Sequence, residues 1–261
     1  MKIETYSLWE NVPGTYDVVP DITAYIPDEK KSDSAVVIFP GGGYAGLCDY
    51  EGDEYARFYA ENGYTAFVVK YRVTPNYFPL PLLDARRGIR FVRYNADKFG
   101  INKSKIAVMG SSAGGHLAAL SSTYYEGIDF EGTDEIDKEN FIPNAQILCY
   151  PVIRLLGKGV GHIGSGKNLL GIELADMGEE LSPDLIASEK TPQAFIWHTS
   201  DDDCVDVRNS LYYAAKLHEL GIKCECHIFP SGRHGLGLCQ DSPHVAQWKS
   251  LLLNWLKHIE F

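Results

Sequence analysis

The amino-acid sequence predicts an α/β fold in which helices flank a mostly parallel central sheet. Short apolar runs bounded by turn residues alternate with longer amphipathic segments, as in sheets whose strands are joined by crossover helices. Most of the apolar runs show little apolar–polar alternation, which is expected of strands buried on both faces. With 261 residues, 45% of them hydrophobic, the chain can bury the large core that such a sheet requires.

The candidate strands and helices follow one another along the chain. Val, Ile and Phe are frequent in six candidate strands, at residues 35–39, 64–71, 106–109, 145–150, 194–199 and 223–229. Five candidate helices cover residues 53–62, 82–99, 113–124, 207–220 and 244–258. In the last of these helices, apolar residues recur at the spacing of one helix face.

Two stretches, residues 125–144 and 153–191, fit the alternation of strands and helices poorly. Both are rich in Gly, Asp, Glu and Ser, and we expect them to form loops or a small cap above the sheet. No stretch of the chain has the composition of a domain linker. We therefore expect residues 1–261 to form a single domain with these two insertions.

The charge balance argues against two classes of partner, and the cysteine pattern bears on the compartment. With 24 Lys and Arg against 35 Asp and Glu, the net charge of −11 argues against binding to nucleic acid or to an anionic membrane surface. No apolar run approaches the roughly 18–20 residues of a membrane span, and residues 1–14 lack the layout of a signal peptide. Six scattered cysteines are expected to be reduced thiols. The sequence thus predicts a soluble, cytoplasmic protein.

The strongest chemical signal is Gly110-Ser111-Ser112-Ala113-Gly114, which lies between a candidate strand and a candidate helix. A nucleophile elbow has this context, because a strained strand-to-helix turn lifts a serine hydroxyl above the sheet while small residues let neighbouring backbone approach. The helix N-terminus then favours an oxyanion that forms beside it. Ser112 is therefore the candidate nucleophile. The alternative is a tight turn in which Gly and Ser only pack and cap the helix.

A second glycine-rich turn, Pro40-Gly41-Gly42-Gly43-Tyr44, follows the first candidate strand. Consecutive glycines can aim free N–H groups at an anion, and the N–H of Ala113 would add another donor of an oxyanion hole. Gly41, Gly43 and Gly46 also match a dinucleotide-binding fingerprint. That interpretation is rejected because no helix opens at once and no acidic residue ends the next strand.

A base and an orienting acid follow Ser112 in the chain order that this architecture requires. His234 lies in a glycine-flanked loop after the last candidate strand, and three acids, Asp201, Asp202 and Asp203, follow the strand at residues 194–199. Asp202 best fits a D-x-x-V pattern, whereas Asp201 and Asp203 stay as alternatives and a solvated acidic turn is the non-functional interpretation. A serine needs such a base to accept its proton, and the acid orients the imidazole.

Two further motifs are set aside. Residues 161–168 come close to a phosphate-binding loop, but Asn168 stands where Ser or Thr would hold magnesium and no apolar strand leads into the segment. Cys224-x-Cys226 is a single pair of metal ligands with no second pair at suitable spacing. We therefore expect no metal site. Of the other histidines, His116 is assigned to packing and His198 to the interior of a strand.

Taken together, these residues resemble the α/β-hydrolase superfamily, and within it the bacterial esterase/lipase group related to hormone-sensitive lipase and to acetyl (xylan) esterases. The resemblance covers the chain from Ala35 to its C-terminus. The matching segments are residues 40–44, 71–73, 81–85, 110–114, 164–165, 168–171, 181–183, 197–202, 227–230 and 232–235. Two departures stand out: Pro40 replaces the His that often opens the glycine loop, and Asp206 replaces the Pro common after the Val of the acid loop.

The resemblance implies a catalytic triad of Ser112, His234 and Asp202. It also implies an oxyanion hole formed by the N–H groups of Gly42, Gly43 and Ala113. Tyr44, at the end of the glycine loop, is the candidate substrate-binding side chain.

The activity implied by the resemblance is cofactor-free hydrolysis of small carboxylic esters with short acyl groups, in which acetylated sugars or xylo-oligosaccharides are the favoured substrates. An amide-bond hydrolase of peptidase or formamidase type, a non-catalytic binding protein and a scaffold are the alternatives. The sequence leaves the oligomeric state open, a homo-oligomer included.

Overall fold

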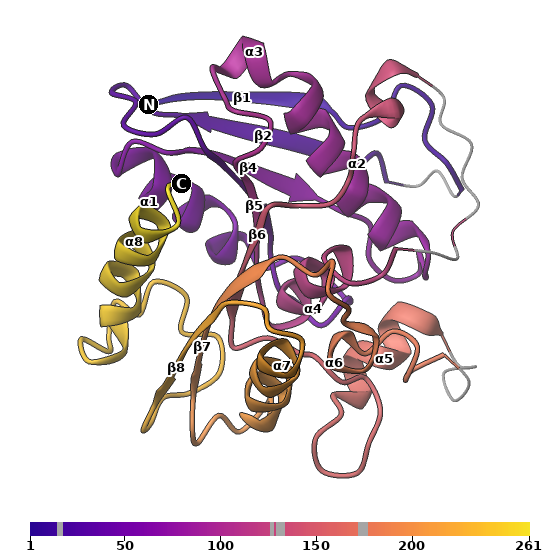
Figure 1. Ribbon diagram of the computed structural model, residues 1–261. Coiled ribbons are helices and arrows are strands. Elements are labelled where there is room, and N and C mark those ends of the chain that lie inside the picture. Colours follow the sequence, from indigo (N-terminus) through magenta and orange to yellow (C-terminus); the bar gives the residue numbers. More distant parts are fainter. Residues whose placement is uncertain (15–17, 126–127, 129–133, 172–176) are drawn as a thin grey trace.

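An eight-stranded sheet runs through the centre of the molecule in the order β1-β2-β4-β3-β5-β6-β7-β8 (Figure 1). The computed structural model describes residues 1–14, 18–125, 128, 134–171 and 177–261. The strands are β1 (Lys2–Ser7), β2 (Asp21–Ile26), β3 (Ala35–Phe39), β4 (Thr65–Lys70), β5 (Ile106–Ser111), β6 (Ala145–Cys149), β7 (Gln193–Thr199) and β8 (Cys224–Phe229). All neighbours from β4 to β8 pair in parallel, whereas β2 is antiparallel to both β1 and β4. The predicted α/β class is confirmed.

All six predicted strands are present, with ends that shift by one or two residues. Strands β1 and β2 were not predicted. No residue of β1 is buried, and polar side chains from Lys2 to Ser7 give it no continuous apolar run. An antiparallel edge strand of this kind is held by its backbone ladder and lacks the apolar signal by which the central strands were found.

Helices cover both faces of the sheet (Figure 1). Tyr55 and Tyr59 of α1 join Trp248 of α8 in the core on one face, and Leu117 of α4 and Leu217 of α7 belong to the core on the other. The helix bounds are α1 (Asp53–Glu61), α2 (Leu80–Tyr94), α3 (Ala96–Phe99), α4 (Ser112–Ser121), α7 (Arg208–Glu219) and α8 (Trp248–His258).

The predicted helix over residues 82–99 is divided into α2 and α3 at Asn95, whose φ of −90° and ψ of 17° leave the helical region. The shorter 3₁₀ helices are η1 (Asp49–Glu51), η2 (Glu135–Lys138) and η4 (Val245–Gln247).

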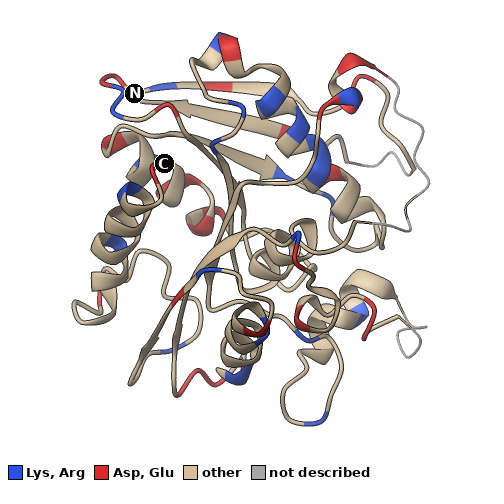
Figure 2. Cartoon of the chain, in the orientation of Figure 1, with Lys and Arg blue, Asp and Glu red and all other residues tan. Residues whose placement is uncertain are grey.

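The two predicted insertions form short helices where they are described. Arginines recur along α2, where they colour parts of the helix blue in Figure 2, and they bind the segment that contains η2. Arg87 pairs with Asp134 and Asp137, and Arg93 donates to the carbonyl of Ile142 at 3.0 Å. The second insertion contributes α5 (Ile163–Leu170) and α6 (Pro183–Ile186). Residues 126–127, 129–133 and 172–176 of these insertions lie outside the described residues.

A buried ion pair joins the end of β4 to α2. Asp84 accepts hydrogen bonds from the backbone N–H and the Nε of Arg72 at 2.9 and 2.8 Å, and from its Nη2 at 2.8 Å. Trp9 donates its indole N–H to the same carboxylate at 2.8 Å. Both charged side chains are 0% exposed, so the pair and its hydrogen bonds compensate a large desolvation cost.

Within the described ranges, no helix combines the length and the apolar character needed to cross a membrane.

Candidate active site

Ser112 lies at the junction of β5 and α4, on the turn that the sequence predicted to be strained. Its φ of 53° is in the left-handed region, which is costly for a residue with a side chain. At Gly114 a Cβ would lie 2.0 Å from the carbonyl oxygen of Phe39, so only glycine lets the loop after β3 approach the turn. The Ser112 residue is 8% exposed. Its hydroxyl is thus presented above the carboxyl end of the sheet at a defined position.

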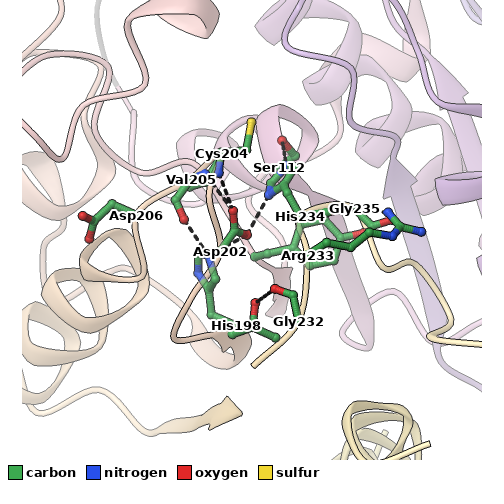
Figure 3. Close-up of polar contacts among 12 residues, drawn as sticks. Ser112, His198, Asp202, Cys204, Val205, Asp206, Gly232, Arg233, His234 and Gly235 are labelled. Atoms are coloured by element: carbon green, nitrogen blue, oxygen red, sulfur yellow. Dashed lines mark hydrogen bonds and ion pairs between the residues drawn. The ribbon is translucent and has the colours of Figure 1, made fainter. Parts of the chain in front are cut away.

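Ser112, His234 and Asp202 form a continuous hydrogen-bonded row (Figure 3). The Oγ of Ser112 is 2.8 Å from Nε2 of His234, and Nδ1 of His234 is 2.7 Å from Oδ2 of Asp202. A carboxylate accepts, so Nδ1 carries the proton and Nε2 is left free to accept from the serine hydroxyl. The three residues follow β5, β8 and β7 and meet at one edge of the parallel sheet. The predicted serine, histidine and acid therefore lie within hydrogen-bonding reach of one another.

The carboxylate of Asp202 is surrounded by donors. Its Oδ1 accepts from the N–H groups of Cys204 and Val205 at 2.9 and 2.8 Å, while His198 and His234 both approach Oδ2. Burial on its own would raise the pKa of this carboxyl group, but hydrogen bonds from His198, His234 and the Val205 N–H hold the pKa well below its usual range. Asp202 is consequently ionised at neutral pH and can stabilise an imidazolium on His234.

The two neighbouring acids occupy different positions. Asp201 accepts a hydrogen bond from the N–H of Gly232 at 2.7 Å and so holds the loop that carries His234, whereas Asp203 is exposed. Asp206, which stands where related sequences often have Pro, accepts from the N–H of Arg208 at 2.9 Å next to the start of α7. Of the three consecutive acids, the structure brings Asp202 to the histidine.

The glycine loop lies beside Ser112, and two of its N–H groups, those of Gly42 and Gly43, are unused. Gly42 has a φ of 132°, and a Cβ there would lie 2.2 Å from the carbonyl oxygen of Gly46. Among the described residues, none accepts a hydrogen bond from the N–H of Gly42 or Gly43. Ala113 is in the first turn of α4, where backbone N–H groups have no intrahelical partner. These three N–H groups are therefore available to bind an anion.

Tyr44 does not line the site as the sequence analysis expected. Its side chain is 0% exposed, and its hydroxyl lies 2.8 Å from Nδ1 of His116. Nε2 of His116 donates to the carbonyl of Leu181 at 2.7 Å, and burial lowers the pKa of this histidine to about 4, so it stays neutral. Tyr44 and His116 thus join the glycine loop to the second insertion through the core.

The segment that resembles a phosphate-binding loop forms part of this attachment. His162 caps the N-terminus of α5 by accepting from the N–H of Ser165, and Asn168 donates its side-chain amide to the carbonyl of Gly43 at 2.8 Å. The segment therefore holds the glycine loop in place. For metal ions, the described ranges contain no group of three or more His, Cys, Asp or Glu side chains placed to bind one.

His198 is the residue of this site that sequence reasoning missed. Its Nε2 faces two acceptors, Oδ2 of Asp202 at 3.2 Å and the carbonyl of Val205 at 3.0 Å, so that nitrogen carries the proton. Nδ1 accepts from the hydroxyl of Ser210 at 2.8 Å. The only sequence signal was a polar residue at the end of an otherwise apolar strand, four positions before Asp202.

Replacing His198 with Phe is expected to lower kcat for ester hydrolysis about tenfold, since a buried hydrogen bond to a charged acceptor is lost. His198→Gln, whose Nε2–H can reach Asp202, should retain more activity than His198→Phe. Steady-state kinetics and thermal unfolding of both variants test this. Equal activity of the two variants and the wild type would contradict a role for His198 in positioning Asp202.

A serine, an acid and a histidine at the carboxyl ends of β5, β7 and β8, in this chain order and on this sheet, define an α/β-hydrolase. The family is given by comparison with known proteins: the chain belongs to the BD-FAE family, whose model matches residues 21–217. The predicted membership of the α/β-hydrolase superfamily is thereby confirmed.

Individual relatives agree with this family. An acetylxylan esterase of Xylanibacter ruminicola is 34% identical over 91% of this chain, and endo-1,4-beta-xylanase B of Butyrivibrio fibrisolvens is 33% identical over 90%. The chain spans 48% and 38% of those two proteins. The crystal structure of an acetyl ester-xyloside bifunctional hydrolase from Caldicellulosiruptor lactoaceticus superimposes with a TM-score of 0.92 at 41% identity, covering 98% of this chain and 96% of that one.

Proposed function

We propose that this chain is a serine carboxylic-ester hydrolase that removes acetyl and other short acyl groups, with acetylated xylo-oligosaccharides as natural substrates. The observation that carries the proposal is the hydrogen bond of 2.8 Å between Ser112 Oγ and His234 Nε2, continued at 2.7 Å to Asp202. This arrangement supplies the base that a serine hydroxyl needs to become a nucleophile.

In the proposed mechanism, Ser112 attacks the ester carbonyl while Nε2 of His234 takes its proton. The N–H groups of Gly42, Gly43 and Ala113 hold the oxyanion of the tetrahedral intermediate. His234 then gives the proton to the leaving alcohol, and a water molecule activated by the same histidine releases the acid from Ser112. Asp202 stays ionised throughout and stabilises the imidazolium.

One structural observation supports a short acyl group. Asn168 of α5 contacts the glycine loop directly, which limits the room beside the oxyanion donors. The names of the two acetyl-ester relatives agree with this choice of substrate.

The wild-type chain is expected to hydrolyse p-nitrophenyl acetate faster than the butyrate, and the butyrate faster than the octanoate, because the acyl group lies against the glycine loop. Release of acetate from acetylated xylo-oligosaccharides, measured by chromatography, tests whether the alcohol part of the natural ester is a sugar. p-Nitroacetanilide serves as the matched amide. Fastest cleavage of the octanoate would contradict the short-chain assignment, and hydrolysis of the anilide without any ester hydrolysis would favour an amidase.

We also propose, as the sequence predicted, that the chain works in the cytoplasm on a small ester, without a nucleic-acid or membrane partner. All six cysteines are free thiols, which supports a reducing compartment. A cytoplasmic enzyme of this kind would act on oligosaccharides small enough to be imported, and acetylated polymeric xylan should then be the poorer substrate.

A further inference from the structure

A buried carboxylate lies behind the glycine loop. Glu51 of η1 is 2% exposed, and its two oxygens have different partners. Oε2 accepts from the N–H of Gly41 at 2.8 Å, and Oε1 accepts from the hydroxyl of Tyr150 at 2.6 Å. Burial raises the pKa of the Glu51 carboxyl group, while the hydrogen bonds from Tyr150 and Gly41 act in the opposite direction and fit the ionised form, in which both oxygens accept. None of the proposed catalytic steps uses this side chain.

The first partner connects Glu51 to the nucleophile. A Cβ on Gly41 would lie 2.3 Å from Oε2 of Glu51, 2.7 Å from the carbonyl oxygen of Ser111 and 3.2 Å from Cβ of Ser112. Gly41 is thus enclosed between the carboxylate and the elbow turn. The hydrogen bond from its N–H fixes the loop immediately before the proposed oxyanion donors Gly42 and Gly43.

The second partner connects Glu51 to the base. The ring of Tyr150 packs edge to face on the imidazole of His234, with centroids 5.1 Å apart and an interplanar angle of 70°. The backbone N–H of Gly237 donates to the Tyr150 hydroxyl at 3.1 Å, so the phenolic proton is free to go to Glu51. Tyr150 has a φ of 36°, in the left-handed region that is costly for a residue with a side chain.

We propose that Glu51 is a positioning residue that holds the oxyanion loop through Gly41 and the base through Tyr150, so that both stay in register with Ser112. The inference rests on the proposed function, because it assigns Glu51 a role in that same reaction. The carboxylate touches neither substrate nor reacting atoms.

Glu51→Gln is expected to reduce kcat for p-nitrophenyl acetate about 10- to 100-fold, with KM changed by less than about threefold, because a charged buried hydrogen-bond acceptor is lost. Tyr150→Phe keeps the ring and the Gly41 contact of Glu51, so it should lower kcat by less than Glu51→Gln does. Glu54→Gln on α1 and Tyr59→Phe, whose hydroxyl contacts the sulfur of Met109, are the matched controls.

Labelling of Ser112 by a fluorophosphonate separates failure of this inference from failure of the proposed function. A wild type that is labelled but hydrolyses no ester overturns the ester-hydrolase assignment. In that case the labelling rates of the variants still test whether Glu51 is a positioning residue. Slow labelling of Glu51→Gln supports the positioning role. Folded Glu51→Gln and Tyr150→Phe proteins with the kcat and labelling rate of the wild type overturn it, and Tyr150→Phe alone decides where Glu51→Gln does not fold.

Discussion

Replacing Ser112 with Ala is expected to lower kcat/KM for p-nitrophenyl acetate by about 10³-fold or more. The substitution removes the Oγ that lies 2.8 Å from Nε2 of His234, and among the described residues no other hydroxyl bonds that nitrogen. The oxyanion donors and the binding site are left in place, so a small residual rate should persist. Steady-state kinetics and loss of fluorophosphonate labelling measure the effect.

Ser121→Ala is the matched control for this substitution. Ser121 is a buried serine on the same helix, and its hydroxyl donates to the carbonyl of Leu117 at 2.7 Å, one turn away. Its activity should stay close to that of the wild type. If Ser112→Ala hydrolysed the ester at within about tenfold of the wild-type rate, Ser112 would not be the nucleophile and the proposed mechanism would fail.

Replacing Asp84 with Ala is expected to lower the free energy of unfolding by about 3–5 kcal/mol, because it leaves a buried guanidinium without its counter-ion. Arg72 is 0% exposed and makes three of its hydrogen bonds to Asp84. Besides those, it donates to the carbonyl of Pro13. Urea unfolding followed by circular dichroism measures the loss.

The surface pair of Glu135 and Lys138 provides the comparison for Asp84. Both side chains are largely exposed, so Glu135→Ala should change stability little. Asp84→Asn, which keeps the shape and removes the charge, should fall between the wild type and Asp84→Ala. A loss below about 1 kcal/mol for Asp84→Ala would show that Arg72 finds another partner or water, contrary to the burial observed here.

Much of the fold and of the site could be predicted because the relevant signals are contiguous in the sequence. The central strands are continuous apolar runs, and the Gly110–Gly114 motif couples a strand, a strained turn and a helix within a few residues. His234 was identified by the glycines around it and by its order after Ser112. In a parallel sheet the loops that follow successive strands meet at one edge, so chain order alone indicates that these residues converge.

Other features depend on contacts between segments that lie far apart in the chain. The conformation of the loop after β7 decides which of three adjacent acids faces His234. The local sequence pattern favoured Asp202 but left the other two as alternatives. Tyr44 was expected to bind substrate, yet it is buried and bonds His116, which in turn donates to the carbonyl of Leu181 in the second insertion. The edge strand β1 had no apolar signal at all.

The sequence by itself therefore determined the fold class, the central strands and the turns that present Ser112 and His234, because backbone strain and burial leave local marks on residue choice. Tertiary structure alone decided the surroundings of those groups. His198 beside Asp202, Asn168 on the glycine loop and Glu51 between Gly41 and Tyr150 are single polar residues in ordinary segments. A hydrogen bond needs one donor and one acceptor in register, and nothing in the neighbouring sequence records which distant atom will be its partner.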